Sequence, residues 1–445
     1  MDVIKQNNVS KNLLMLFSSI AERLNRDSFI KNVLLIAGGT AAAQLITILC
    51  TPVVTRLYTP ADFGVLTVFT AILGIIGQLS TLRYSVAVPL AENENLANNI
   101  LQLCFFISFF LSLIFGAVTL LFGDLFSGSL SIADAVHYSW LLPICLLGIG
   151  LYEALAAWAV RRKHFNIISR TKLSQGITSS CVKILLGWVG IKPMGLLLGF
   201  LASEIAGTGS IFTAFRREHP SFFRNMSWQG IINAAIRYRN FPLLQSWSRL
   251  LLSLGVQLPA IFMAASFGAR DAGLFGLASS MVSIPMNLMG ASVAQVYYSE
   301  IASYGKSKPD VILRLSISII RKMVLVGIIT IGFLALAGPW LFTIVFGAEW
   351  HDAGVYATML SVLAIGQFVS SPIMHCLDVL EKQGLQFLLN VIRVFLVVSV
   401  FMLCAKFGFS SESTILWYSI FTFAYYVMVV TIVLIALSSA KMKRA

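Results

Sequence analysis

Seven charged residues lie inside long apolar stretches of the sequence, where an ionised side chain costs free energy and is therefore usually functional. At the centre of a membrane helix such a charge costs about 2.5–3.5 kcal/mol on insertion scales, so these residues usually face a cavity or a partner. The seven are Arg83, Glu153, Lys183, Glu204, Arg249, Asp378 and Arg393. Three of the four bases are arginines, whose planar guanidinium group suits bidentate binding of phosphate or carboxylate. The set predicts an anion-binding cavity inside a membrane.

Each residue also has a structural interpretation that the sequence leaves open. Arg83 lies near the end of its apolar stretch and could simply extend its side chain to the membrane surface. Lys183 and Glu204 fall on neighbouring segments and could only neutralise each other. Asp378 lies near the end of a segment, where water could solvate it. Arg249 is deeper in its segment and is the strongest single candidate.

No residue pattern indicates covalent catalysis, a metal site or a cofactor. The sequence contains no HExxH motif, no nucleophile elbow and no arrangement of Ser, His and Asp. Its six cysteines are far apart inside apolar stretches, without CxxC or Cys/His spacing, and are interpreted as packing residues. We therefore predict no catalytic residue and no metal ligand.

The composition shows that the apolar stretches are membrane helices. The 445 residues are 58% hydrophobic and 11% charged, with a mean hydropathy of +0.84, whereas a soluble domain carries about 25% charged residues. A spanning helix needs about 20 mostly apolar residues. Twelve such segments lie near residues 33–54, 64–90, 97–122, 136–160, 166–190, 193–215, 241–265, 272–298, 315–345, 354–378, 385–406 and 414–438. The sequence thus predicts an all-α integral membrane protein with about 12 transmembrane helices.

The basic residues support this number of helices. If the N-terminus is cytoplasmic, most of the 32 Lys and Arg residues fall on the cytoplasmic side, Lys172 among them, and the outer loops are mainly acidic. The net charge of +13 is then a consequence of topology, and no segment outside the membrane is long enough to fold into a nucleic-acid-binding domain. We expect both termini to be cytoplasmic and no nucleic-acid partner.

A repeat divides the chain into two halves. Pro52 to Leu66 resembles Pro259 to Phe275: each stretch has a helix with a proline, a short outer loop, and an Asp-x-Gly motif (Asp62 to Gly64, Asp271 to Gly273) that opens the next helix. Aspartate favours a helix N-terminus because it caps the helix and complements its dipole. The separation equals six helices, so both halves have the same orientation. We predict a cytoplasmic segment 1–32, lobes 33–215 and 241–438, a basic linker 216–240 and a tail 439–445. Within the first lobe, Gly195-Leu-Leu-Leu-Gly199 predicts a close contact between helices.

The motif Arg56-Leu-Tyr-Thr-Pro-Ala-Asp-Phe-Gly64, after a first helix rich in Gly, Ala and Thr, resembles the start of bacterial Wzx-type O-antigen and capsule oligosaccharide flippases. These belong to the multidrug/oligosaccharidyl-lipid/polysaccharide exporter superfamily. The resemblance covers essentially the whole chain and includes the counterpart at 268–273. It implies two six-helix lobes around a central hydrophilic cavity, through which the sugar headgroup of a polyprenyl-diphosphate lipid crosses the bacterial inner membrane by alternating access.

If the chain serves O-antigen, capsule or exopolysaccharide synthesis, as the resemblance implies, the intramembrane charges suggest a hypothesis for the roles of the candidate residues. Arg83 and Arg249, one from each lobe, would bind the diphosphate or an acidic sugar, and Glu153 and Asp378 would tune that site or take up a coupling proton. The other substrate-binding candidates are Lys183, Arg393, Gln44 and Gln245. We expect no cofactor, an H⁺ or Na⁺ coupling ion, a lipid-linked oligosaccharide as substrate, and polysaccharide polymerase or chain-length proteins as partners.

Two other functions are consistent with parts of the sequence. An ion-coupled drug or cation antiporter of the same superfamily would share the fold, but its lobes usually carry carboxylates, whereas here the intramembrane bases outnumber the acids. A membrane polysaccharide polymerase or ligase would be expected to have a large outer loop with catalytic residues. The longest outer loop predicted here, 123–135, is short and plain.

Overall fold

The computed structural model describes residues 28–129, 137–220, 222, 224, 226–305 and 308–442, and these are almost entirely helical. Residues 1–27 and 443–445 of the predicted terminal segments and residues 130–136 of the predicted outer loop lie outside the described part. The structure differs from the prediction over residues 123–129 of that loop. These residues are helical, because the preceding helix, Glu94–Ser129, continues to Ser129.

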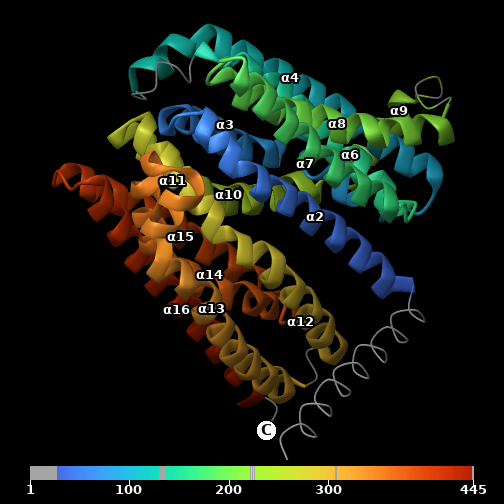
Figure 1. The fold of residues 1–445 in the computed structure, drawn as a ribbon. Coiled ribbons are helices and arrows are strands. Elements are labelled where there is room, and N and C mark those ends of the chain that lie inside the picture. Colours follow the sequence, from blue (N-terminus) through green and yellow to red (C-terminus); the bar gives the residue numbers. More distant parts are fainter. Residues whose placement is uncertain are drawn as a thin grey trace, which may run out of the picture.

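Within the described residues, twelve long helices form two bundles of six (Figure 1). The first lobe contains α2 (Ser28–Leu57), α3 (Pro60–Ile76), α4 (Glu94–Ser129), α6 (Leu141–Arg161), α7 (Phe165–Trp188) and α8 (Met194–Glu218). The second contains α10 (Ser246–Phe267), α11 (Ala269–Pro285) continuing into α12 (Ala291–Tyr304), α13 (Pro309–Phe346), α14 (His351–Val379), α15 (Gln383–Lys406) and α16 (Ser411–Met442). The predicted fold class is therefore confirmed.

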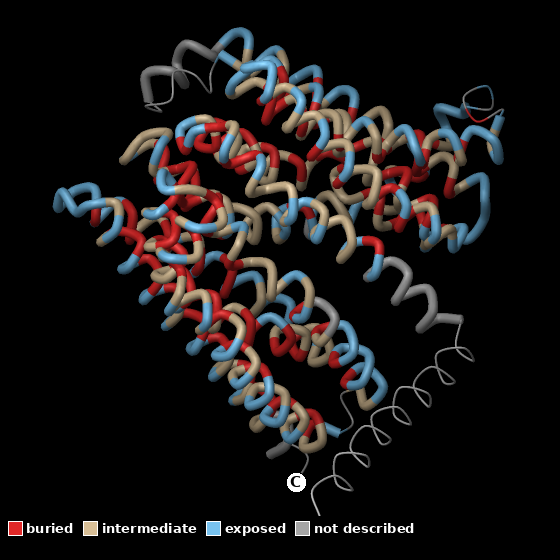
Figure 2. Tube along the Cα trace, viewed as in Figure 1, coloured by how far each residue is buried: buried red, intermediate tan, exposed pale blue. Residues whose placement is uncertain are grey.

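Eleven of these helical segments are long and apolar enough to cross a membrane. The twelfth is α7, which is long enough to span but carries too many polar side chains to match the others in hydropathy. In the described part of the chain, large apolar side chains such as Leu336, Trp188 and Leu120 are at least four-fifths exposed, as contact with lipid requires. Buried residues follow the inner faces of the helices (Figure 2).

The second predicted helix, 64–90, is wrong in its second half. Helix α3 ends at Ile76, and the chain continues in two short 3₁₀ turns, Gly77–Leu79 and Tyr84–Ala87. Between these turns Leu82 and Arg83 have left-handed backbones, with φ of 44° and 62°. Arg83 therefore lies in a break after the helix rather than in the helix itself.

The predicted linker, 216–240, contains a short helix. The domain boundaries predicted from the sequence stay predictions. Helix α9 (Trp228–Arg237) begins at Ser227, whose hydroxyl accepts a hydrogen bond from the amide of Gly230. It packs against α4 of the first lobe, where Trp228 contacts Phe106 with ring centroids 5.0 Å apart. Two π-helical turns, Phe241–Gln245 and Met286–Gly290, occur in the second lobe.

The lobes meet through α3 and α11 and separate toward the start of α2 and the end of α12 (Figure 1). At the meeting end, the indole of Trp350 donates a hydrogen bond to the carbonyl of Thr55 at 3.1 Å, and the Thr55 hydroxyl donates to the carbonyl of Phe346 at 3.2 Å. Trp350 also contacts the ring of Phe63 edge-on at 4.9 Å. We call Thr55, Phe63, Phe346 and Trp350 the seal.

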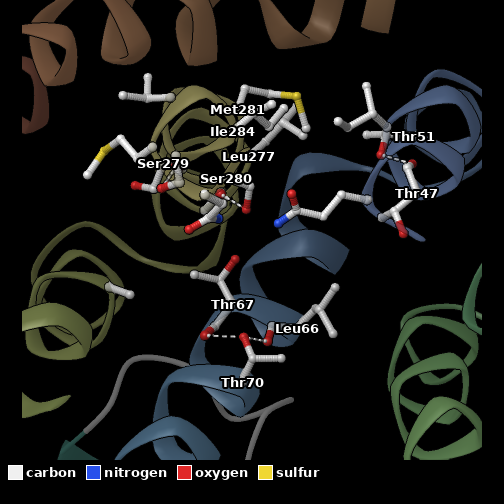
Figure 3. A pocket seen from close by; sticks show the side chains of 18 of the residues that line it. Thr47, Thr51, Leu66, Thr67, Thr70, Leu277, Ser279, Ser280, Met281 and Ile284 are labelled. Carbon is white, nitrogen blue, oxygen red and sulfur yellow. Dashed lines mark hydrogen bonds between the residues drawn. The ribbon is translucent and has the colours of Figure 1, made fainter. Parts of the chain in front are cut away.

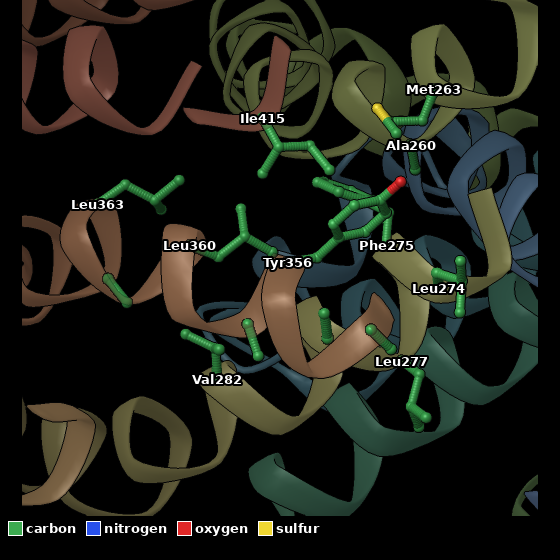
Figure 4. Close-up of a cluster of buried hydrophobic side chains, with 14 of the residues drawn as sticks. Ala260, Met263, Leu274, Phe275, Leu277, Val282, Tyr356, Leu360, Leu363 and Ile415 are labelled. Atoms are coloured by element: carbon green, nitrogen blue, oxygen red, sulfur yellow. The ribbon is translucent and has the colours of Figure 1, made fainter. Parts of the chain in front are cut away.

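The core of the second lobe continues from the seal between α10, α11, α14 and α16 (Figure 4). Tyr356 is part of this core; its hydroxyl donates a hydrogen bond to the carboxylate of Asp271 and accepts one from the hydroxyl of Ser411. Asp62, the counterpart of Asp271, instead forms the predicted cap with Thr59. The capping prediction is thus confirmed for Asp62, whereas Asp271 serves to connect helices.

Candidate functional site

A cavity of about 750 Å³ lies between the two lobes. Helices α2, α3, α7 and α8 line it on one side, and α10, α11, α14, α15 and α16 line it on the other. Its volume is near the upper end of the range of about 300–1,000 Å³ that small-molecule sites occupy. Two lobes that each contribute one wall can change the shape of the cavity when they move relative to each other.

The charges on the cavity wall are all positive among the described residues. Lys172 and Lys183 come from α7 and Arg393 comes from α15, whereas no Asp or Glu is in the lining. Because a cavity between membrane helices is screened less than a protein surface, an uncompensated base there attracts anions strongly. The cavity therefore suits an anionic ligand.

Lys183 owes its position to two glycines of α8. A Cβ atom on Gly199 would clash with the side chain of Lys183, and one on Gly195 would clash with the hydroxyl of Tyr58. That hydroxyl donates to the Lys183 carbonyl at 2.8 Å, and burial raises the pKa of Tyr58 to about 12, so the donor keeps its proton. The predicted close contact at the GxxxG motif is confirmed, and it seats a base in the cavity wall.

Arg393 is a buried base without a carboxylate partner among the described residues. Its side chain is 7% exposed, its guanidinium lies 5.4 Å from the ring centroid of Tyr426, and its Nε has no hydrogen-bond partner. A cation–π contact offsets only part of the cost of removing a guanidinium from water. Arg393 is nevertheless one of the residues that line the cavity.

Hydroxyl groups from three helices surround the remaining space (Figure 3). Thr47 and Thr51 of α2, Thr70 of α3 and Ser280 of α11 each donate to a backbone carbonyl of their own helix. Such bonds use the hydroxyl proton and leave the oxygen lone pairs free to accept hydrogen bonds. Amides from Gln44, Gln175, Gln257, Asn287 and Gln367 add both donors and acceptors.

Of the predicted site residues, three line the central cavity and two lie in a pocket beside it. Gln44, Lys183 and Arg393 line the cavity. Arg83 and Glu153 line the adjoining pocket and form an ion pair, with Nη1 and Oε1 3.3 Å apart. The structure thus brings Arg83 together with an acid, which leaves Lys183 and Arg393 as the uncompensated bases among the predicted residues that line the cavity.

The other three predicted residues line neither space. Arg249 and Gln245 are exposed on the second lobe, although Arg249 is close enough to Arg83 for the two guanidinium groups to repel each other. Asp378 lies at the end of α14, where its carboxylate is 3.1 Å from Nδ1 of His375. Their predicted roles stay predictions.

A polar stripe on α7 lines the cavity, and of its residues the sequence predicts only Lys183 as a site residue. Lys172, Gln175, Gly176, Ser179 and Lys183 occupy positions i, i+3, i+4, i+7 and i+11, and all line the cavity. That spacing places them on one helix face. The sequence predicts Lys172 on the cytoplasmic side, whereas its Nζ is 3.2 Å from the Gln175 amide oxygen in the cavity wall. The low hydropathy of the segment was the signal that could have identified them.

Lys183 and Glu204 do not form an ion pair in the described structure. Glu204 of α8 interacts electrostatically with Lys172 instead. In the part of the chain that the structure describes, no cluster of three His, Cys, Asp or Glu side chains could hold a metal ion.

Sequence comparisons relate this chain to proteins of polysaccharide synthesis. Residues 53–355 match the family model described as polysaccharide biosynthesis protein. The chain is 20% identical over 350 residues to the succinoglycan biosynthesis transport protein ExoT of Rhizobium meliloti, covering 78% of this chain and 67% of that protein. It is 24% identical over 220 residues to the teichuronic acid biosynthesis protein TuaB of Bacillus subtilis, covering 48% of this chain and 43% of that protein.

Solved structures show the same fold. A multidrug resistance MATE family transporter of the MOP superfamily in an inward-facing conformation superposes with a TM-score of 0.73 at 13% identity, covering 90% of this chain and 96% of that chain. An outward-facing conformation of a MATE family transporter gives a TM-score of 0.60 at 14% identity, covering 94% and 98%. The chain thus has the fold of a multi-pass membrane transporter.

Proposed function

This chain belongs to the polysaccharide biosynthesis protein family, and from its transporter fold we propose that it flips a polyprenyl-diphosphate-linked oligosaccharide from the cytoplasmic to the periplasmic leaflet of the bacterial inner membrane. The observation that carries the proposal is the cavity between the lobes, lined by Lys172, Lys183 and Arg393 and, among the described residues, by no carboxylate. A diphosphate is anionic and fits this charge, while the hydroxyls and amides suit the sugar.

The lipid tail stays in the bilayer while the headgroup moves through the cavity. The seal closes the end of the cavity near Thr55 and Trp350, and the lobes diverge at the other end. We assign the diverging end to the cytoplasm, because the basic clusters at 161–163 and 216–217 lie at the ends of α6 and α8, on the side where the start of α7 packs against the start of α2, and basic residues favour the cytoplasmic side. The headgroup then enters from the inner leaflet, and opening of the seal releases it outside.

The competing antiporter function is less well supported by the cavity. A drug or cation antiporter requires acidic groups that attract its substrate, and the described lining residues are basic. A polymerase or ligase requires reactive groups, whereas the structure offers a hydroxyl and amide surface. An H⁺ or Na⁺ coupling ion, the absence of a cofactor, and contact with a polymerase or chain-length protein stay predictions.

The proposal is tested by deleting the gene and measuring both surface polysaccharide and lipid-linked repeat units. We expect loss of the polymer and accumulation of repeat units in the inner leaflet, restored by the wild-type gene but not by Lys183→Met or Arg393→Met at matched protein levels. Exposed Arg314→Met is the matched control and should complement, since Arg314 lies near the start of α13 and outside the cavity. Unchanged polysaccharide with raised drug sensitivity would instead support the antiporter.

A further inference from the structure

A second cavity of about 440 Å³ adjoins the central one inside the first lobe. Thr70 and Phe200 line both cavities, so the two spaces are neighbours with a shared wall. The second is formed by α3, the turn after it, α6 and α8. We call it the side pocket. Its volume is within the range that a small-molecule group occupies.

Hydrogen bonds hold Glu153, the acid of the side pocket, and Arg83, its base, in position. Oε1 of Glu153 accepts a hydrogen bond from Ser85 at 2.8 Å as well as from Arg83, and Oε2 accepts one from Ser80 at 3.2 Å. All three donors come from the segment that interrupts the helix after Ile76. Left-handed backbones at two successive non-glycine residues, one of them Arg83, are costly and persist where the surroundings impose them, often at ligand sites.

The side pocket retains hydrogen-bonding capacity for a neutral polar group. Nε of Arg83 is buried and has no partner among the described residues, while the Glu153 oxygens have further lone pairs. Gln78 adds an amide to the lining, and Tyr152 adds a ring over which Nζ of Lys172 lies at 4.7 Å. Donors, acceptors and an apolar ring in one small space complement a sugar, whose hydroxyls donate and accept and whose carbon face is apolar.

The two cavities differ in charge. They therefore suit two different parts of one ligand, the diphosphate and the sugar. The described lining of the central cavity is basic without an acid, whereas the side pocket pairs one base with one acid. A carboxylate repels phosphate but accepts hydrogen bonds from sugar hydroxyls. Resting on the proposed function, we propose that the side pocket binds one sugar residue of the oligosaccharide while the diphosphate occupies the central cavity, so that Arg83, Glu153 and Gln78 select the glycan.

The test compares two lipids on the purified full-length protein in nanodiscs. One is undecaprenyl diphosphate, which has no sugar, and the other is the lipid-linked repeat unit extracted from the source strain. We expect Glu153→Gln and Gln78→Met to weaken binding of the sugar-bearing lipid about tenfold and to leave binding of the bare lipid unchanged. Arg393→Met should weaken both.

Gln78→Met preserves the ion pair and so separates sugar binding from any structural role of Glu153. Thr208→Ala is the control, because its hydroxyl joins α8 to α6 through the Gly148 carbonyl and lines neither cavity. The inference is overturned if the wild type binds both lipids equally, or if both side-pocket variants weaken the two lipids equally. Absence of binding of either lipid to the wild type would overturn the proposed function itself.

Discussion

Gly64 and Gly273, the last residues of the two Asp-x-Gly motifs, pack reciprocally across the interface between the lobes. A Cβ atom on Gly64 would overlap the carbonyl oxygen of Ala269, and one on Gly273 would overlap that of Pro60. Pro60 precedes Gly64 by four residues, as Ala269 precedes Gly273. The repeated motif therefore contacts its own copy, and the two lobes close on each other at an axis of approximate twofold symmetry.

The first prediction concerns this contact. Gly273→Ala should prevent full closure of the lobes at the seal, because the added methyl group meets a backbone oxygen that cannot rotate away. Overpacking of this kind costs about 1–3 kcal/mol, which shifts a two-state equilibrium about 5- to 150-fold. The measurement is maleimide labelling of a cysteine at Val54, which is 5% exposed next to the seal, in a protein without its native cysteines.

Gly209→Ala is the matched control for that substitution, because no atom lies within 4 Å of a Cβ built at Gly209. Labelling at position 54 should rise in Gly273→Ala and in Gly64→Ala, and should stay at the parental rate in the control. Equal rates in all three variants would show that the close contact does not hold the lobes together.

The second prediction concerns the hydrogen bond from Trp350 to the Thr55 carbonyl. Trp350→Phe retains an aromatic ring against Phe63 but leaves the buried carbonyl without its donor, at a cost of about 1–3 kcal/mol. Closure at the seal should weaken, so labelling at position 54 should rise while the rate of substrate entry from the cytoplasmic side falls. Trp340→Phe serves as the control, since Trp340 is exposed on α13. If only the control changes the labelling rate, the seal lies elsewhere.

How much the sequence predicts depends on whether a residue's signal is local. Hydrophobic length predicts the helices, and the cost of a membrane charge predicts that Lys183 and Arg393 face a cavity, because both rules act within one helix. The break at Leu82 and Arg83 has no such signal, since neither residue is a glycine and the partner of Arg83 there is Glu153, 70 residues further along the chain. Lys172 was misplaced because a base near a membrane surface satisfies the positive-inside rule whether it faces cytoplasm or cavity.

The third prediction is a dependence of stability on pH that originates at His219, just beyond α8. The indole of Trp158 donates to Nε2 of His219 at 3.3 Å, which requires the neutral ring, and burial together with nearby Arg162 lowers the pKa of His219 despite Glu94 and Glu218. Below about pH 6.5 the unfolded chain therefore takes up a proton before the folded one does, and stability falls as pH decreases. His219→Gln keeps an acceptor for Trp158 and should reduce the loss of stability that accompanies a fall in pH.

Thermal unfolding in detergent between about pH 7.5 and 5.5 measures the effect. His137→Gln is the control, because His137 is exposed and contacts Tyr138 instead of this cluster. The wild type and the control should both lose stability toward acid, and His219→Gln should lose less. If the unfolding midpoint falls with pH at the same slope in all three proteins, the pH dependence originates from the surrounding carboxylates.

The last prediction separates function from stability at Arg393. This guanidinium is buried against Tyr426 without a carboxylate partner in the described structure, so we expect it to destabilise the empty protein and to bind the ligand under the proposed function. Arg393→Met should abolish transport while the midpoint of thermal unfolding stays unchanged or rises. Arg393→Lys keeps the charge but loses the fork that binds phosphate bidentately, so it should retain only partial transport.

Addition of undecaprenyl diphosphate should raise the unfolding midpoint of the wild type more than that of either Arg393 variant, because a ligand that binds only the folded state stabilises that state more as its affinity increases. A variant that loses transport and stability together would show that Arg393 mainly holds α15 against α16.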